Sequence, residues 1–327
     1  MYTHLEESHA PDPTHDVSGS DPDRSRPSVC HVLADSWSRR VAVRTSQLDM
    51  KSYGDPTIPD FPSRMVPFRD DPRYGALEPV FRQRVLAAAW VAYNEKTIAV
   101  EKAIVAPACD LLLEGAFHCT DAAATKRAVA QTLVDEHYHV LMCLDACIAT
   151  RELHGLSSLR IPKPVVVHEL ERAIDASGDA REAEITRLAF AIVAETTINA
   201  YLDLLANDAS IQPINRDTTA LHRRDESSHA KLFKEFARGL FGALTERERR
   251  VFVRALGAGL GAFVKVDFGA WGAILTHLAV AGAGTLLDGC SGPGKPQRVF
   301  RDFSGFRLLL RDLSVPESAV PFEFDAP

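Results

Sequence analysis

Residues Leu221 to Leu232 read LHRRDESSHAKL, and the spacing of their polar residues decides the fold predicted for the chain. Residues three, four and seven apart share one face of an α-helix. His222, Glu226 and His229 meet that condition, so two imidazoles and a carboxylate project from one helical stripe. Apolar residues flank the stripe, so part of this face should point into a core. A buried ionised carboxylate needs a partner, because burying one uncompensated is very costly.

A matching pattern lies about ninety residues upstream, in the stretch Gln131 to Cys143, QTLVDEHYHVLMC. It contains Glu136 and His139 in the spacing Glu-x-x-His, and Asp135 precedes the glutamate as Asp225 does in the later helix. Both segments therefore read D-E-x-x-H. The spacing alone is a weak signal, and a third copy in the Pro- and Asp-rich N-terminal tail is a chance match. The copies at 135–139 and 225–229 are more significant, because each lies in an amphipathic helical segment.

Two more glutamates interrupt apolar helical runs. Glu101 lies in VAYNEKTIAVEKAIVAPAC, and Glu195 lies in LAFAIVAETTINAYLDLLA. The chain thus offers one set of metal-ligand side chains on each of four helices, in an order that resembles the ferritin-like di-iron or di-manganese carboxylate bundles. The predicted fold is all-α: a ferritin-like four-helix bundle with additional helices and a di-metal carboxylate centre in the bundle core.

Composition agrees with a globular helical protein. The 327 residues are 46% hydrophobic and 25% charged, and the net charge of -7 gives no sign of nucleic-acid binding. The one uncharged stretch long enough for a membrane span, Phe268 to Leu287, contains four Gly, two Thr and a His, so a buried core helix is favoured. No membrane association is expected. The N-terminus has no apolar signal segment, which predicts a cytoplasmic protein.

The six cysteines include no C-x-x-C pair, so a disulfide framework is not expected. Cys143 and Cys147 lie one turn apart on the helix that carries His139. They have two interpretations, a thiolate metal ligand or a pair of small core residues. The second is favoured, since free cysteines are commonly buried.

The predicted organisation has three parts: residues 1–32 as a disordered tail, 33–290 as the helical di-iron domain, and 291–327 as a C-terminal segment that packs on the bundle. Residues 52–72 are Pro-rich and are expected to form an irregular strap over the bundle. The expected helices are 32–48, 79–115 with a kink at Pro107, 121–155 with Asp121 as its N-cap, 165–176, 179–209, 217–242, 245–268 with a capping box from Thr245 to Glu248, 270–287, and a last one within 299–313.

Mixed carboxylate and imidazole ligands suit iron or manganese better than zinc. Four carboxylates would neutralise two divalent ions, which favours a bridged di-iron(II) centre. The expected ligands are Glu101 and His139 for one iron, Glu195 and His229 for the other, and Glu136 and Glu226 as bridges.

His222 and the two aspartates have alternative interpretations. His222 is either a hydrogen-bonded histidine on the helix surface or a third imidazole on the iron of Glu195 and His229. Asp135 and Asp225 are either solvated helix charges or carboxylates that accept the free N–H of a metal-bound imidazole. In the second case Asp135 would pair with His229, and Asp225 with His139.

Seven short strings then produce a specific resemblance. They are Y-N-E (93–95), V-D-E (134–136), A-E-T (194–196), I-N-A (198–200), I-Q-P (211–213), R-D-E (224–226) and R-D-F-S-G (301–305). With them, the chain from about Arg40 to Phe324 resembles the p-aminobenzoate N-oxygenase family of ferritin-like di-iron enzymes. The resemblance implies an O2-dependent enzyme that oxidises an aryl amine through hydroxylamine and nitroso stages to a nitro compound, by way of a peroxo species on two irons.

The resemblance also implies site residues. All seven family ligands have a match here: Glu101, Glu136, His139, Glu195, His222, Glu226 and His229. Family pocket residues match Tyr93, Asn199 and Arg301, and Asn199 lies one turn after Glu195 on the same helix face. Two positions depart from the family pattern, with Lys96 in place of Arg and Val100 in place of Thr. Lys lacks the bidentate fork that suits a carboxylate, so a larger or less acidic arylamine becomes credible.

The expected cofactors are two iron ions with O2 as co-substrate, and manganese as an adventitious metal. No dinucleotide fingerprint or iron–sulfur cysteine cluster is found, so electrons should come from a separate reductase or ferredoxin. The resemblance implies a homodimer. Two other functions are weighed against the N-oxygenase: a di-iron hydroxylase or desaturase acting on carbon, and a ferritin-like iron-binding protein without an organic substrate.

Overall fold

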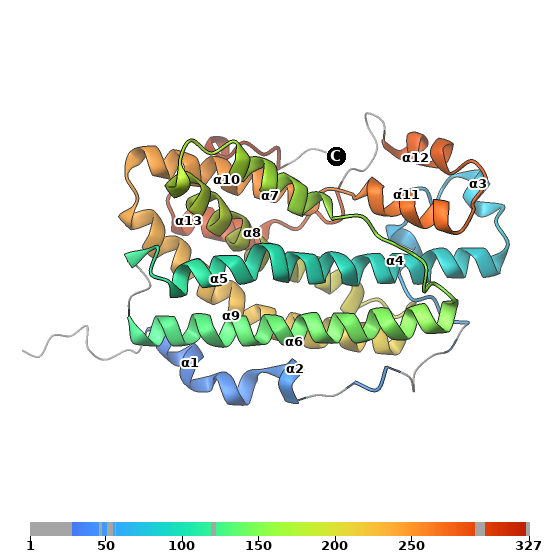
Figure 1. Cartoon of the computed structure of the whole chain (residues 1–327), viewed down its shortest axis with the longest axis horizontal. Helices are drawn as coiled ribbons and strands as arrows, with labels where there is room; N and C mark the ends of the chain where they lie inside the picture. Colours follow the sequence, from blue (N-terminus) through green and yellow to red (C-terminus); the bar gives the residue numbers. More distant parts are fainter. Residues whose placement is uncertain are drawn as a thin grey trace, which may run out of the picture.

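The computed structural model describes residues 28–45, 48–50, 55, 57–118, 122–291 and 298–324, and these residues form helices joined by loops (Figure 1). Within these ranges, β pairing is limited to one isolated antiparallel bridge between Lys265 and Arg298. The predicted all-α class is therefore confirmed.

Four long helical segments build the central bundle. The first segment consists of two consecutive helices, α4 (Pro79–Val100) and α5 (Ala106–Leu113). The other three are single helices: α6 (Ala123–His154), α8 (Ala180–Ala206) and α9 (Pro213–Ala243). α4 packs mainly on α6, and α8 packs mainly on α9. Figure 1 shows α6 along the front of the molecule below α4 and α5, with α8 and α9 behind. The two helix pairs predicted from the sequence are present.

Several predicted helix boundaries are confirmed. α6 ends at Gly155, which has a left-handed φ of 63° that a side chain would strain. The Asp179 side chain accepts a hydrogen bond from the Glu182 backbone N–H and caps α8. Thr245 and Glu248 form the expected capping box at the start of α10 (Glu246–Val264). α6 itself begins at Ala123, and its predicted cap, Asp121, lies outside the described residues.

The start of α9 differs from the prediction. The sequence around Pro213 and Asn215 was expected to be a loop with the helix starting at Asp217, but α9 begins at Pro213. Proline is well suited to the first helical turn, where its missing N–H would have no helical partner. The Asn215 amide donates to the carbonyl oxygen of Asp60 at 2.9 Å, which ties this turn to the strap.

The irregularity expected at Pro107 lies slightly upstream. Residues Glu101–Val105 form a π-helical turn between α4 and α5, and Pro107 then falls in the first turn of α5. A π-turn holds one residue more than an α-turn and opens the regular hydrogen-bond ladder. The loosened turn accommodates the proline, which supplies no backbone N–H. It also places Glu101 at the junction, pointing into the core.

The remaining helices cover two sides of the bundle. α1 (Val29–Arg40) and α2 (Ala42–Thr45) lie along α6 and α9, whereas α7 (Val165–Asp175), α10, α11 (Phe268–His277), α12 (Ala283–Ser291) and α13 (Ser304–Asp312) lie on the opposite side (Figure 1). α3 (Pro72–Gly75) is one short turn beside the strap. α1 begins at Val29, inside the stretch predicted as tail, and residues 1–27 lie outside the described residues.

The prediction of a single helix from residue 270 to 287 is wrong. The chain instead forms α11 and α12, separated by a turn in which Ala279 and Gly282 have positive φ angles of 52° and 72°. Glycine adopts such angles readily, and it breaks an apolar run that otherwise reads as continuous helix. Among the described helices, α8 alone is long and apolar enough to cross a membrane, but 78% of its apolar window is buried in the bundle.

The C-terminal segment packs closely on α8 through Gly305, the last residue of the R-D-F-S-G string. A Cβ atom at Gly305 would lie 2.6 Å from the backbone oxygen of Thr196, the residue after Glu195. We expect Gly305→Ala to destabilise the protein by about 1–3 kcal/mol, because backbone must move to make room. Urea denaturation of the variant checks this.

Gly242→Ala is the matched control for that experiment. Gly242 lies near the end of α9, and a Cβ there would meet nothing within 4 Å. Alanine is therefore expected to be neutral or mildly stabilising at this position. Equal urea midpoints for the two variants would contradict the close packing of Gly305 on α8.

Candidate metal centre

Seven potential ligand side chains converge in the middle of the bundle, and all are buried. Glu101 comes from the π-turn, Glu136 and His139 from α6, Glu195 from α8, and His222, Glu226 and His229 from α9. Their ligand atoms form three overlapping groups, each within a 4.8 Å span: Glu101–His139–His222–Glu226, Glu136–His139–Glu226–His229, and Glu101–Glu136–Glu195. The seven residues predicted from the sequence therefore share one small region.

Two imidazoles turn the same ring nitrogen to the centre. His139 Nδ1 lies 2.8 Å from Glu136 Oε2 and 3.3 Å from Glu226 Oε1. His229 Nδ1 lies 3.0 Å from Glu136 Oε1 and 3.4 Å from Glu226 Oε1. Glu136 and Glu226 thus stand between the two rings, which is the position that a bridging carboxylate needs.

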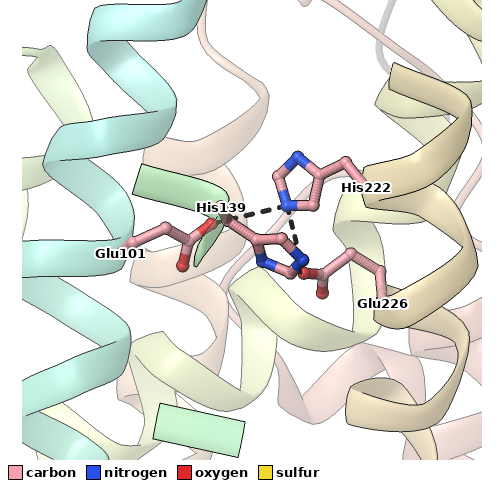
Figure 2. A group of neighbouring side chains, drawn as sticks. All are labelled: Glu101, His139, His222 and Glu226. Atoms are coloured by element: carbon pink, nitrogen blue, oxygen red, sulfur yellow. Dashed lines mark hydrogen bonds and ion pairs between the residues drawn. The ribbon is translucent and has the colours of Figure 1, made fainter. Parts of the chain in front are cut away.

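The third imidazole, His222, lies on the side of Glu101 and His139. Figure 2 shows Glu101 approaching from one helix, His222 and Glu226 from the opposite one, and His139 between them. His222 Nε2 is 3.1 Å from Glu226 Oε1 and 3.7 Å from Glu101 Oε1, and its ring packs on His139 with centroids 4.1 Å apart. Of the two interpretations of His222, a histidine on the helix surface does not agree with its 1% exposure. The other interpretation placed it with Glu195 and His229, but it lies beside Glu101 because it is one helical turn away from Glu226 in that direction.

Both aspartates lie behind the imidazoles in the cross-pairing expected from the sequence. His229 Nε2 is 3.3 Å from Asp135 Oδ2, and His139 Nε2 is 3.6 Å from Asp225 Oδ2. Both aspartates are fully buried, which is incompatible with the alternative of solvated helix charges. With the outer nitrogen of each ring facing an aspartate, the inner Nδ1 of each imidazole can present its lone pair to a metal ion.

The region of α1 and α2 also supports the two aspartates, and this contribution was not predicted from the sequence. The indole Nε1 of Trp37 donates to Asp135 Oδ1 at 2.8 Å. The backbone N–H groups of Ala42 and Val43 donate to the two Asp225 oxygens at 2.7 and 3.1 Å. No spacing rule links α1 and α2 to the bundle helices, and backbone donors carry no sequence signal at all.

The four buried carboxylates shift one another's pKa values. The pKa of Glu101 and the pKa of Glu195 are both raised well above the usual range, because burial disfavours the charged form and the negative charges of Glu136 and Glu226 add to that effect. Burial also acts on Glu226 and would raise its pKa, but His229 and His222 together outweigh burial, so the pKa of Glu226 is lowered. The four carboxylates are thus not equivalent.

The imidazole pKa values shift in the direction that this charge predicts. Burial disfavours a charged His139, but Glu136 and the other carboxylates outweigh it and raise the pKa of His139 to about 10. The pKa of His229 is raised for the same reasons. In the protein without metal, protons on these rings therefore compensate part of the negative charge that a cation would otherwise neutralise.

Unpaired polar atoms show that the residues fit metal ions. Three carboxylate oxygens of the centre have no hydrogen-bond partner among the described residues: Glu101 Oε2, Glu195 Oε2 and Glu226 Oε2. Buried polar groups are rarely left unsatisfied, because each costs about 1–3 kcal/mol. Carboxylate oxygens and imidazole nitrogens in this number and proximity suit a pair of divalent cations.

The cysteines that the structure describes do not belong to the centre. The five cysteines of the described chain are free and buried, and none belongs to the three ligand groups. Burial raises the pKa of Cys147 to about 12 and that of Cys143 well above its usual value. Both are therefore protonated core thiols, in agreement with the favoured interpretation.

Trp37→Phe tests the outer support of the centre. The change removes the hydrogen bond to Asp135 while keeping an aromatic ring, so Asp135 loses a contact that fixes its orientation toward His229. We expect metal affinity to fall by about 10–100-fold, the usual cost of losing such a partner. Competition against a chelator measures it, with Trp271→Phe as the control. Equal affinity in both variants would show that Trp37 does not support the centre.

Two cavities share part of their lining, and the smaller one is bordered by α4. The smaller is lined by Tyr93, Lys96 and Tyr201, and the larger, of about 840 Å³, is lined by Tyr201, Arg298 and Arg301. Residues that line both are Phe61, Tyr201, Trp271 and Val299. Three of the predicted pocket residues thus lie along one connected region. Val100 and Asn199, also predicted, line neither cavity.

Lys96 is partly buried among aromatic side chains. Its Nζ donates to the carbonyl oxygen of Phe263 at 3.2 Å and lies 5.6 Å from the ring centre of Tyr201 and 5.4 Å from that of Phe263. Burial lowers the pKa of Lys96 to about 8, partly offset by Asp267. The side chain thus offers a compact positive charge near Tyr93 at neutral pH, and the rings that surround it fix its position.

Comparison with known proteins agrees with this geometry. Residues 23–313 match the family model described as P-aminobenzoate N-oxygenase AurF. A 4-aminobenzoate N-oxygenase of Streptomyces thioluteus is 38% identical to this chain over 296 residues, which cover 89% of this chain and 88% of that protein.

Proposed function

Because this chain belongs to the p-aminobenzoate N-oxygenase AurF family, we propose that it is an O2-dependent di-iron enzyme that oxidises the amino group of an aryl amine. The observation that carries the proposal is the convergence of four glutamates and three histidines, all buried, from four helical segments. When bound, two ferrous ions would reduce and activate O2 for oxidation of the amine. The full course would run through the hydroxylamine and nitroso compounds to a nitro compound.

The protein would contribute position, charge and protection from water. Glu136 and Glu226 would bridge the ions, with Glu101, His139 and His222 on one side and Glu195 and His229 on the other. Asp135 and Asp225 would hold the outer N–H of His229 and of His139, keeping Nδ1 of each ring directed at the centre. The surrounding core excludes bulk water, because the ligand residues are at most 4% exposed.

The two cavities suggest how the amine is oriented. Tyr93 and Tyr201 pack edge to face with their ring centres 5.3 Å apart. An aromatic substrate ring would lie against this pair, and an anionic substituent would be drawn toward Lys96 or toward the arginines of the larger cavity. The larger cavity could admit a substrate well beyond aminobenzoate in size. Electrons would come from a separate reductase or ferredoxin. Manganese is the alternative metal, and elemental analysis of protein purified from cells distinguishes it from iron.

The direct test is anaerobic loading with Fe(II), followed by rapid mixing with O2 in the presence and absence of p-aminobenzoate. We expect optical changes that depend on the amine, together with hydroxylamino, nitroso or nitro products detected by mass spectrometry. Rapid oxidation to a ferric mineral that is indifferent to amine would support iron storage instead. Hydroxylated carbon in the product would support a hydroxylase.

Lys96→Arg tests whether residue 96 binds the carboxylate of the substrate. Arginine presents a fork that binds a carboxylate with two hydrogen bonds, whereas lysine is a point charge. If Lys96 faces the carboxylate, the variant should lower KM for p-aminobenzoate by about 10- to 150-fold, the equivalent of one added hydrogen bond to a charged group. An aniline with a methyl group in place of the carboxylate is the control substrate. An equal change for both substrates would remove Lys96 from carboxylate recognition.

A further inference from the structure

Trp37 joins the metal centre to the protein surface through a short chain of polar contacts. Its indole Nε1 donates to Asp135 Oδ1 at 2.8 Å, and Asp135 Oδ2 lies 3.3 Å from Nε2 of the candidate ligand His229. The other ring nitrogen of His229 faces Glu136 at 3.0 Å, inside the centre. Asp135 and His229 are buried, whereas Trp37 is partly exposed. The two buried side chains thus form a continuous path from the centre to an aromatic ring at the surface.

The second imidazole leads to the same part of the surface. His139 Nε2 lies 3.6 Å from Asp225 Oδ2, and the Asp225 oxygens accept the backbone N–H groups of Ala42 and Val43 at 2.7 and 3.1 Å. Residues 37–44, at the end of α1 and in α2, therefore lie at the outer end of both paths. Figure 1 shows α1 and α2 at the lower edge of the molecule. Of the described residues that line the two cavities, none belongs to this segment.

The surface of this segment is basic. Arg39 and Arg44 are exposed, and residues 36–48 include no Asp or Glu. Asp35, the acid nearest to the segment in sequence, forms an ion pair with an arginine of α6. The Arg44 guanidinium lies over the Trp37 ring, 4.9 Å from the ring centre. Positive charge therefore lies directly beside the partly exposed indole.

We propose that residues 37–44 bind a small acidic ferredoxin, and that its electrons enter the metal centre through Trp37. The need for these electrons rests on the proposed function. When an amine is oxidised to a hydroxylamine, one oxygen atom of O2 goes to nitrogen and the other leaves as water, with uptake of two electrons and two protons. Two ferrous ions supply the two electrons and become ferric. Two reduced ferredoxins, each giving up one electron, then return both ions to the ferrous state.

Charge and position together favour this partner. An acidic protein would be steered toward Arg39 and Arg44, and contacts between electron-transfer proteins are small enough to be made by one short segment and its surroundings. Electron tunnelling weakens steeply with distance, so the entry point should lie where the path to the centre is short. The hydrogen bond to Asp135 and the contact with Arg44 both hold the Trp37 ring in position for this transfer. On the opposite side of the bundle, α7 and α10 pack over α8 and lengthen the path.

Calorimetric titration of the metal-free protein with an oxidised, acidic plant-type ferredoxin tests the binding surface. The parent protein should bind, more weakly at high salt, and Arg44→Glu should weaken binding by about 10-fold at low salt, because steering charges change association rates by that much or more. Arg254→Glu is the matched control, since it makes the same charge change at an exposed arginine of α10. It should bind like the parent. Equal affinities of the two variants, affinity that does not depend on salt, or no binding to the parent overturns the docking site.

Stopped-flow reduction of the ferric protein by reduced ferredoxin tests the path. Trp37→Phe, loaded to the same iron content as the parent, should have a maximal rate several-fold lower at an unchanged half-saturating concentration of ferredoxin. Arg44→Glu should instead raise the half-saturating concentration. Reduced methyl viologen is the control reductant, because it needs no protein docking surface, and it should reduce Trp37→Phe as fast as the parent. A maximal rate that is unchanged in Trp37→Phe, or that falls equally with methyl viologen, overturns Trp37 as the entry point.

The proposed function is tested separately, because chemically reduced parent protein needs no ferredoxin for a single exposure to O2 and amine. Absence of N-oxygenated product there, with binding and reduction by ferredoxin intact, would contradict the proposed function and support the docking site. Product formation there without reduction by ferredoxin would support the proposed function and overturn the docking site.

Discussion

Glu226→Ala is expected to eliminate amine oxidation. The loss of activity should exceed about 100-fold, which is the usual upper limit when a residue hydrogen-bonded to a metal ligand is removed. Glu226 Oε1 lies 3.1 Å from His222 Nε2, 3.3 Å from His139 Nδ1 and 3.4 Å from His229 Nδ1. It is the one carboxylate close to all three imidazoles of the centre. Its removal therefore disturbs both proposed metal positions together.

Metal content and turnover should be measured on the same sample of Glu226→Ala. We expect fewer than two iron ions per chain after anaerobic loading, and no N-oxygenated product above background. Glu235→Ala is the control, because Glu235 lies on the same helix but pairs with Arg238 near the surface. A Glu226→Ala protein that keeps two irons and normal turnover would disprove the proposed centre.

Glu195→Leu should have opposite effects on stability and on function. Burial and the charges of Glu226 and Glu136 raise the pKa of Glu195, which means that its ionised form is destabilised in the metal-free fold. Leucine has a similar volume and carries no charge, so it should stabilise the metal-free protein by about 1–4 kcal/mol, as other replacements of buried charges do. Without that ligand, however, metal binding and amine oxidation should fall sharply.

Thermal unfolding with and without Fe(II) checks this expectation. The parent protein should gain stability on metal addition, whereas Glu195→Leu should start from a higher melting temperature and gain less. Glu184→Leu on the same helix is the control, because Glu184 is partly exposed beside Arg181 and should change stability by only about 0.5 kcal/mol. A metal-free Glu195→Leu protein that melts below the parent would show that Glu195 contributes favourably to the empty site.

The bundle could be predicted from the sequence because its signals are local. Helical periodicity identifies which residues of α6 and α9 share a face, and cap residues such as Asp179 and Thr245 mark where helices begin. The same periodicity identifies Glu136 with His139 and Glu226 with His229. The glutamates at 101 and 195 stand out because each is a charge in an apolar run.

Other features depend on contacts that no local pattern encodes. The side of the centre on which His222 lies follows from the relative rotation of α9 and the π-turn. The hydrogen bonds from Trp37, Ala42 and Val43 follow from where α1 and α2 dock. The division of residues 270–287 into two helices depends on a turn that the apolar composition hides.

The π-helical turn at Glu101–Val105 limits how this helix can change by insertion or deletion. Loss of one residue from the turn would restore a regular α-helix, and would rotate α4 by about 100° and shift it by about 1.5 Å relative to α5. Tyr93 and Lys96 would then leave the cavity that they share with Tyr201, while the α5 side of the junction stayed in place. Point substitutions in α4 can adjust the pocket, but a change of even one residue in length would separate the pocket from the metal ligands.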